Sequence, residues 1–116
     1  MSGPLTVLTT TGSRPAAEAL ARSAVADRLA ACAQIEGPVT SVYRWNGEIQ
    51  TDEEWRVLYK TTTSRYPALE SHIRATHPYD TPEIIATGIT HGSAEYLRWL
   101  AEETTQAPNT TGDATP

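Results

Sequence analysis

Apolar and polar residues alternate with two different periods, and these periods predict a succession of strands and helices. Residues 5–11 (LTVLTTT) are apolar and β-branched, which is typical of a β-strand. Gly12 breaks the strand and Ser13 can cap a following helix. Apolar residues then recur at spacings of three and four, which predicts one long helix that extends to Cys32. Its apolar face comprises Ala17, Ala21, Val25, Leu29 and Cys32.

The middle of the chain predicts a long β-hairpin. A strand runs through Ile35, bends at residues 37–38 (GP) and resumes over residues 39–45. Residues 46–47 (NG) are the strongest short signal for a type I′ hairpin turn. The return strand covers residues 48–63 without an internal glycine or proline. We therefore expect two unusually long antiparallel strands.

The second half predicts two more helices and one more strand. Ser64 can cap a helix that Pro78 ends, residues 82–90 read as a strand, and residues 92–93 (GS) open a third helix. The order β-α-β-β-α-β plus a helix indicates an α+β protein with a ferredoxin-like plan, in which the helices cover one face of an antiparallel sheet. We expect one domain over residues 1–104 and a disordered polar tail over residues 105–116.

The length of the hairpin has a consequence for assembly. A return strand of about sixteen residues would span roughly 50 Å, whereas a domain of this size has a diameter of about 35 Å. The hairpin must bend, contain a bulge or project. A projecting hairpin would expose Tyr43, Trp45, Ile49 and Trp55 along an unpaired edge, which favours aggregation. We therefore expect an obligate oligomer in which a partner subunit covers that edge.

Composition narrows the class of partner. The 116 residues carry a net charge of −5, which argues against a nucleic-acid ligand. Cys32 is the single cysteine, so no disulfide can form within the chain. The chain contains neither a signal-peptide pattern nor an apolar run of about 20 residues, so we expect no membrane span and a cytoplasmic location.

Residues 77–83 (HPYDTPE) are the most informative stretch for chemistry. Two prolines restrain the backbone, so the polar groups between them lie on a semi-rigid bend. His77 is the first candidate nitrogen ligand, and Glu83 and Asp80 can supply oxygens. Such ligands suit copper or zinc. Alternatively, His77 ends the helix and hydrogen-bonds to backbone carbonyls.

Other polar residues allow weaker hypotheses. On the predicted helix Cys32 is either a small buried hydrophobe or a soft metal ligand. Four basic residues near the hairpin, Lys60, Arg44, Arg56 and Arg65, could form an anion pocket between subunits. We expect them instead to pair with the acidic residues Glu48, Asp52, Glu53 and Glu54. No nucleophile-and-base arrangement or phosphate-binding loop occurs, so we do not expect an enzyme.

These motifs together make the chain resemble the CutA family of divalent-cation tolerance proteins. The matching motifs occur at residues 29–32 (LAAC), 41–47 (SVYRWNG), 60–61 (KT), 77–83 (HPYDTPE), 92–93 (GS) and 96–100 (YLRWL). The resemblance implies a ferredoxin-like homotrimer that associates with copper and other divalent cations. It implies metal ligands at Cys32, His77 and Glu83, and an intersubunit cleft lined by Trp45, Lys60 and Tyr79.

The sequence departs from the family in two places. Cys32 stands alone, whereas some bacterial relatives carry further cysteines, and Gln34 replaces the asparagine that many relatives have. The resulting expectation is a non-enzymatic homotrimer without an obligatory cofactor, which binds Cu(II) or another divalent cation. Two alternatives stay open. One is a PII-like trimeric regulator that binds a small anionic metabolite through Lys60, Arg44 and Arg65, and the other is a stable scaffold without a ligand.

Overall fold

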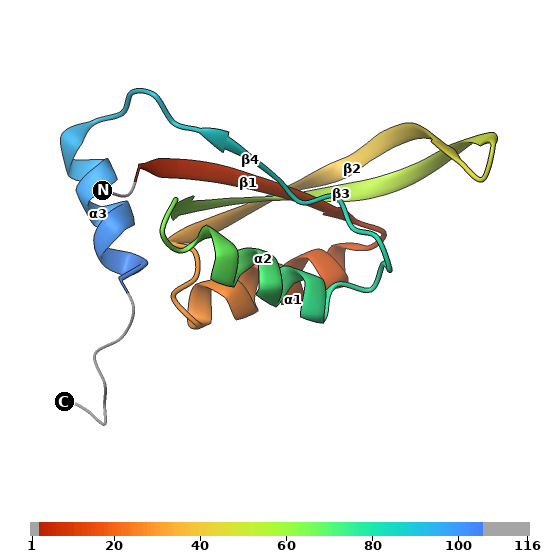
Figure 1. Ribbon diagram of the computed structural model, residues 1–116. Helices are drawn as coiled ribbons and strands as arrows, with labels where there is room; N and C mark the ends of the chain where they lie inside the picture. Colours follow the sequence, from red (N-terminus) through yellow and green to blue (C-terminus); the bar gives the residue numbers. More distant parts are fainter. Residues whose placement is uncertain (1–2, 106–116) are drawn as a thin grey trace.

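The element order of the protein agrees with the order predicted from the sequence. A computed structural model describes residues 3–105 of the chain (Figure 1). It contains, in order, β1 (Pro4–Thr11), α1 (Arg14–Ala26), β2 (Cys32–Trp45), β3 (Glu48–Thr62), α2 (Tyr66–Thr76), β4 (Ile85–Gly88) and α3 (Ala94–Glu103). The α+β class is therefore confirmed. The tail predicted over residues 105–116 lies, apart from Thr105, outside the described residues.

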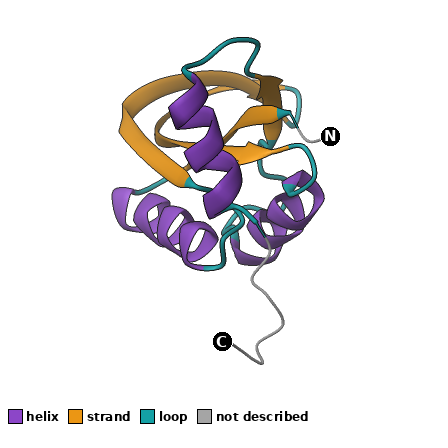
Figure 2. Cartoon of the chain, turned by 90° about the vertical axis from the view of Figure 1, so that its left-hand side faces the viewer, coloured by secondary structure: helices purple, strands orange, loops and turns teal. Residues whose placement is uncertain are grey.

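The described strands form one antiparallel sheet, in the order β2-β3-β1-β4. Both α1 and α2 lie against the same face of this sheet, and α3 lies near one end of it (Figures 1 and 2). The core forms between the sheet and the two helices, where the side chains of Val7, Val57, Leu69 and Ile73 are fully buried. Side chains alternate along a strand, so every second side chain points to the other face of the sheet. Neither α1 nor α2 covers that face.

The first helix is shorter than the periodicity predicts. It ends at Ala26, because Arg28 adopts a left-handed conformation with φ of 59°. The amides of Arg28 and Leu29 donate to the carbonyls of Val25 and Ala24 at 3.0 and 2.9 Å, which is the Schellman pattern that ends a helix. Glycine usually marks this position, and arginine gives no such signal. The prediction that Cys32 lies on the helix is therefore wrong, because Cys32 begins β2.

The start of the second helix also differs from the prediction. Arg65, not Ser64, is the N-cap of α2, and its side chain makes no capping hydrogen bond. The predicted cap Ser13 is confirmed, and Ser93, from the pair predicted to open the third helix, caps α3. Each serine accepts a hydrogen bond from a first-turn amide at 3.2 Å. None of the helices in the described part of the chain is both long and apolar enough to cross a membrane.

The hairpin both contains a bulge and projects beyond the rest of the domain. Asn46 and Gly47 have φ values of 52° and 79°, as a type I′ turn requires. The register shifts between Glu36 and Val39, where the sequence predicted a bend. The molecule measures 52 × 32 × 21 Å, and β2 and β3 extend past the helices at one end (Figure 1). We call residues 39–54, the part beyond the shift, the arm.

The arm carries apolar side chains that this chain leaves uncovered. Val42, Trp45 and Ile49 are 66, 54 and 69% exposed. Within the described chain β2 and β4 are the edges of the sheet, so each has one side without a strand partner. An exposed apolar edge of this length is the feature from which the sequence predicted a partner subunit.

Candidate functional site

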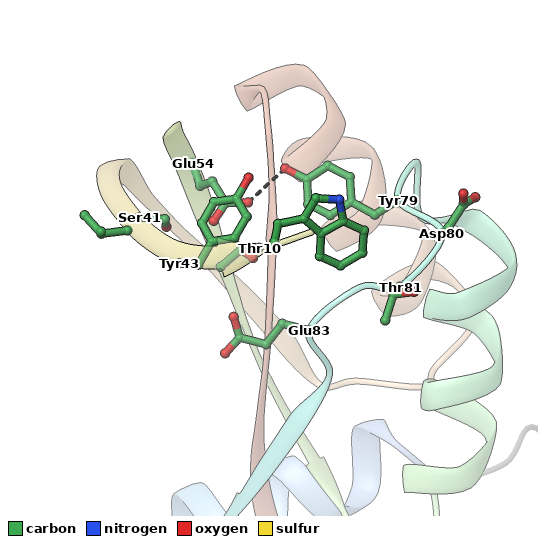
Figure 3. A pocket seen from close by; sticks show the side chains of 10 residues that line it. Thr10, Ser41, Tyr43, Glu54, Tyr79, Asp80, Thr81 and Glu83 are labelled. Carbon is green, nitrogen blue, oxygen red and sulfur yellow. Dashed lines mark hydrogen bonds between the residues drawn. The ribbon is translucent and has the colours of Figure 1, made fainter. Parts of the chain in front are cut away.

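An open cleft lies between the arm and the loop that follows α2, with a volume of about 570 Å³. Figure 3 shows Tyr43 and Glu54 of the hairpin facing Tyr79 of the loop, with Glu83 at the near end of β4. The lining residues are Thr10, Ser41, Val42, Tyr43, Trp45, Glu54, Tyr79, Asp80, Thr81 and Glu83. Three of these ten residues are acidic and none is basic, so the cleft attracts cations.

His77 holds the loop that forms one wall of this cleft. It is the C-cap of α2, with the extended backbone that the following Pro78 favours. Its ring Nε2 lies 2.8 Å from the carbonyl oxygen of Thr10, to which it donates. Its Nδ1 accepts from the amide of Tyr79 at 3.0 Å. Both ring nitrogens are therefore engaged, which is the structural alternative that the sequence analysis left open for His77.

The surroundings of His77 favour its neutral form. The side chain is buried, and this burial lowers the pKa of His77 below its ordinary value of 6.5. The carbonyl of Thr10 and the charge of Glu54 oppose the effect of burial. The tautomer that satisfies both hydrogen bonds carries its proton on Nε2 and its lone pair on Nδ1. His77 can coordinate a metal ion only after one of these hydrogen bonds is broken.

Two tyrosines that line the cleft are each hydrogen-bonded to a carboxylate. Tyr79 donates its hydroxyl proton to Glu54 at 2.8 Å, and Tyr43 donates to Asp52. Burial is the main cause that raises the pKa of Tyr79, and the hydrogen bond to Asp52 is the main cause that raises the pKa of Tyr43. Both phenols therefore keep their protons and act as donors. The carboxylates are the groups that can meet a cation.

Glu54 and Asp52 were not predicted as residues of the site, although the sequence contains a signal for both. From the turn at residues 46–47, the hairpin register sets Tyr43 opposite Gln50, so Asp52 is its diagonal neighbour on the same face. Alternation then puts Glu54 on that face as well. Counting from the turn would have found both carboxylates, but the partner Tyr79 comes from a loop that register cannot place.

The two carboxylates of the bend at residues 77–83, Asp80 and Glu83, do not converge on His77. Glu83 is exposed and points toward the side of the cleft formed by the hairpin (Figure 3). Asp80 is also exposed, and its carboxylate points away from Glu54 (Figure 3). The proline bend therefore presents oxygens around an open space and not at one point.

Cys32 and Lys60 lie at the other end of the sheet. They are opposite each other on β2 and β3, and the thiol of Cys32 lies 3.6 Å from the hydroxyl of Tyr96 in α3. Lys60 donates to Gln34 at 2.9 Å. Along β3, Lys60 and Glu54 are separated by roughly 20 Å of extended strand. Within one chain Trp45 and Tyr79 line this cleft, whereas Lys60 and Cys32 lie outside it. The prediction of a cleft between subunits lined by Trp45, Lys60 and Tyr79 stays a prediction.

The basic residues near the hairpin do not assemble an anion pocket in this chain. Arg56 pairs with Glu36 at 2.7 Å, because the two residues are opposite each other in the β2–β3 register. Arg65 donates to the carbonyl of Arg28 at 3.5 Å. The expected partners of the basic residues were wrong, since Asp52 and Glu54 accept from tyrosines. The two other acidic residues of the arm, Glu48 and Glu53, pair with no basic residue among the described ion pairs.

A closed metal site is not present within the described part of a single chain. No group of three or more His, Cys, Asp or Glu side chains there could hold a metal ion. The three predicted ligands Cys32, His77 and Glu83 are separated, with Cys32 at the opposite end of the sheet. An ion bound in the cleft would therefore meet an open set of oxygens, which holds a metal weakly unless further ligands complete it.

Comparison of the sequence with known proteins shows which family it matches. Residues 5–103 match the family model described as CutA1 divalent ion tolerance protein. The divalent-cation tolerance protein CutA of Thermus thermophilus is 47% identical over 98 residues, which cover 84% of this chain and 95% of that protein. The chloroplastic protein CutA of Arabidopsis thaliana is 43% identical over 100 residues, which cover 86% of this chain and 55% of that protein.

Solved structures agree with the fold. The structure of the divalent cation tolerance protein (Cut A1) from Thermus thermophilus superposes with a TM-score of 0.86 at 45% identity. The alignment covers 88% of this chain and 99% of that one. The similarity therefore extends over the sheet and the three helices.

Proposed function

Because the chain belongs to the CutA1 family of divalent ion tolerance proteins, we propose that it acts without catalysis in cation tolerance, by binding divalent ions such as Cu(II) weakly. The observation that carries this proposal is the cleft beside the arm, whose lining includes three carboxylates and no basic side chain. A cation entering it meets oxygen ligands and a favourable field. We place this activity in the cytoplasm.

The ligands in this proposal have unequal roles. Glu83 and Glu54 are the leading oxygen ligands, because both line the cleft. His77 supplies a nitrogen only when the bond from the Tyr79 amide to its Nδ1 breaks. Cys32 lies at the other end of the sheet, so it can reach an ion at this cleft only from a neighbouring subunit.

A homotrimer with the ferredoxin-like plan completes the proposal. The sheet order β2-β3-β1-β4 and the two helices on one face support that plan. The exposed apolar arm and the open edge of β2 support an assembly in which each arm packs against a neighbour. Such packing brings the end of one sheet near the cleft of another, where ligands from two chains can meet.

Calorimetric titration of Cu(II) into the wild-type protein and single variants tests the proposed ligands. We expect Glu83→Gln to weaken binding about tenfold, since it removes one charged oxygen ligand while keeping the shape of the side chain. Glu53→Gln is the matched control, because Glu53 is adjacent to Glu54 on β3 but points to the opposite face and does not line the cleft.

His77→Gln serves as the third variant in the same series. Affinity within about twofold of wild type is expected for it, because the ring nitrogens of His77 are already engaged by Thr10 and Tyr79. Equal Cu(II) affinity of the wild type and Glu83→Gln would exclude Glu83 as a ligand of the ion. A large loss in His77→Gln would show instead that the imidazole leaves its hydrogen bonds to bind the ion.

A further inference from the structure

We propose that the same cleft binds aliphatic diamines and polyamines, a class of ligand beyond the divalent ions of the proposed function. The lining that one chain provides combines the three aromatic rings of Tyr43, Trp45 and Tyr79 with carboxylates and includes no lysine, arginine or histidine. Aromatic faces and carboxylates are the two groups that recognise an organic ammonium ion. Both walls offer both groups, since the hairpin supplies Tyr43, Trp45 and Glu54 and the bend supplies Tyr79 and Glu83. Such a cavity suits a ligand with charged ends and an apolar body.

The size of the cleft favours an organic cation over a bare metal ion. Its volume of about 570 Å³ lies within the usual range for small-molecule sites. A divalent ion needs several ligands that converge to within roughly 2.0–2.6 Å of one point. No group of three or more potential ligand side chains converges in this way in the described part of the chain. The space is therefore larger than a bare ion can fill with contacts.

The aromatic walls are accessible and held in place. Tyr43, Trp45 and Tyr79 are 41, 54 and 38% exposed, so part of each ring is open to a ligand. The two tyrosines are fixed by their hydrogen bonds to Asp52 and Glu54, and both phenols stay neutral donors. Rings fixed before binding lose little conformational entropy when a ligand arrives. Their faces attract an ammonium group through the quadrupole of the π-system.

The carboxylates can hold two ammonium groups at once. A carboxylate offers about four acceptor positions, and Tyr79 uses one position on Glu54. Glu83 approaches the cleft from the neighbourhood of β4, whereas Glu54 lies on β3 (Figure 3). A single ammonium ion needs one of these groups, but a diamine can bridge both. The methylene chain between its two charges then lies against Trp45 and Tyr43.

The test is a calorimetric titration of 1,4-diaminobutane into the full chain, with EDTA present so that metal ions play no part. We expect saturable binding, and no binding of 1,4-butanediol, which has the same chain length without the charges. Glu54→Gln and Glu83→Gln should each weaken diamine binding about tenfold, and Trp45→Leu about threefold. Glu53→Gln should leave the affinity unchanged, because this carboxylate lies outside the cleft.

Two outcomes would overturn the proposal. One is the absence of saturable diamine binding, and the other is an equal loss in Glu53→Gln and Glu54→Gln, which would reveal diffuse attraction by the net charge. The circular dichroism of each variant verifies that it folds. If Trp45→Leu fails to fold, Glu54→Gln still tests the inference. The EDTA separates this result from the Cu(II) titration, so either proposal can fail while the other stands.

Discussion

His77 shows how a single side chain can serve the site without belonging to its ligands. It links three segments, since it ends α2, donates a hydrogen bond to the carbonyl of Thr10 in β1 and accepts a hydrogen bond from the amide of Tyr79. The position of Tyr79, and hence its hydrogen bond to Glu54, depends on this imidazole. We interpret His77 primarily as the residue that positions the cleft wall.

The pH dependence of stability tests this interpretation. Burial lowers the pKa of His77, so the unfolded chain binds this proton at a higher pH than the folded chain does. The contribution of His77 to the free energy of unfolding is therefore complete above its ordinary pKa of 6.5 and decreases as the pH falls below it. His77→Gln should lose this pH-dependent part, and also about 1–3 kcal/mol at pH 7.5 for the broken hydrogen bonds.

Urea denaturation at a series of pH values, at fixed protein concentration, measures both effects. His91→Gln is the control, because His91 is exposed and bonds only to the neighbouring Thr90 hydroxyl among the described contacts. The same pH slope in the wild type and in His77→Gln would contradict the buried, neutral imidazole. NMR titration of the ring protons of His77 should place its pKa below 6.5 directly.

Among the elements, the hairpin determines the shape of the site. The register shift between Glu36 and Val39 changes the pairing of β2 with β3 and sets Val39 opposite Glu54. Gly37 lies inside this shift, packed against the indole of Trp55. The bulge therefore sets which side chains of the arm face Tyr79, including the carboxylate of Glu54.

Replacing Gly37 should disturb this arrangement measurably. A Cβ at this position would lie 2.8 Å from Cδ1 of Trp55 and 3.1 Å from the carbonyl oxygen of Glu54. We expect Gly37→Ala to lower the free energy of unfolding by about 1–3 kcal/mol, because the ring and the backbone must move apart. Urea denaturation at a fixed protein concentration measures the change.

Gly88→Ala is the matched control for that substitution. A Cβ added to Gly88 in β4 meets nothing within 4 Å, so stability should change by less than about 1 kcal/mol. If Gly37→Ala were as stable as Gly88→Ala, the packing of the bulge against Trp55 would not define the hairpin.

The overall dimensions of the protein connect the fold to its assembly. The radius of gyration is 15.6 Å, whereas a compact chain of about 116 residues should have roughly 13 Å. The excess comes from the arm, which leaves Val42 and Ile49 largely exposed. A neighbouring subunit that covers these side chains would gain apolar burial and pair the open edge of β2.

Light scattering tests the proposed trimer. Three chains of 12.6 kDa should give a particle of about 38 kDa. Placing a charge at the centre of the exposed arm, as in Val42→Lys, should shift the mass toward that of one chain. The reason is that burying a lysine at the interface is unfavourable unless an oppositely charged group pairs with it. Val25→Lys is the control, since Val25 is a partly exposed valine that lies on α1, outside the arm. A wild-type mass of 12.6 kDa would contradict the trimer.

Local signals in the sequence were sufficient for the order of the elements. Residues 46–47 and the helix caps Ser13 and Ser93 act within a few residues, so their effect can be read directly from the chain. The end of α1 was not predicted, because Arg28 adopts a left-handed conformation that glycine usually occupies. As a result Cys32 was assigned to the wrong element.

The cleft has a different origin. Its residues come from β1, from both strands of the hairpin and from the loop after α2, and they meet only because the sheet order places these segments together. Periodicity identifies which residues share a face of one element, but it cannot measure distances between elements. The polar residues of the bend were therefore foreseeable from the chain, whereas the pairing of Tyr79 with Glu54 and the separation of Cys32 from both depend on long-range packing.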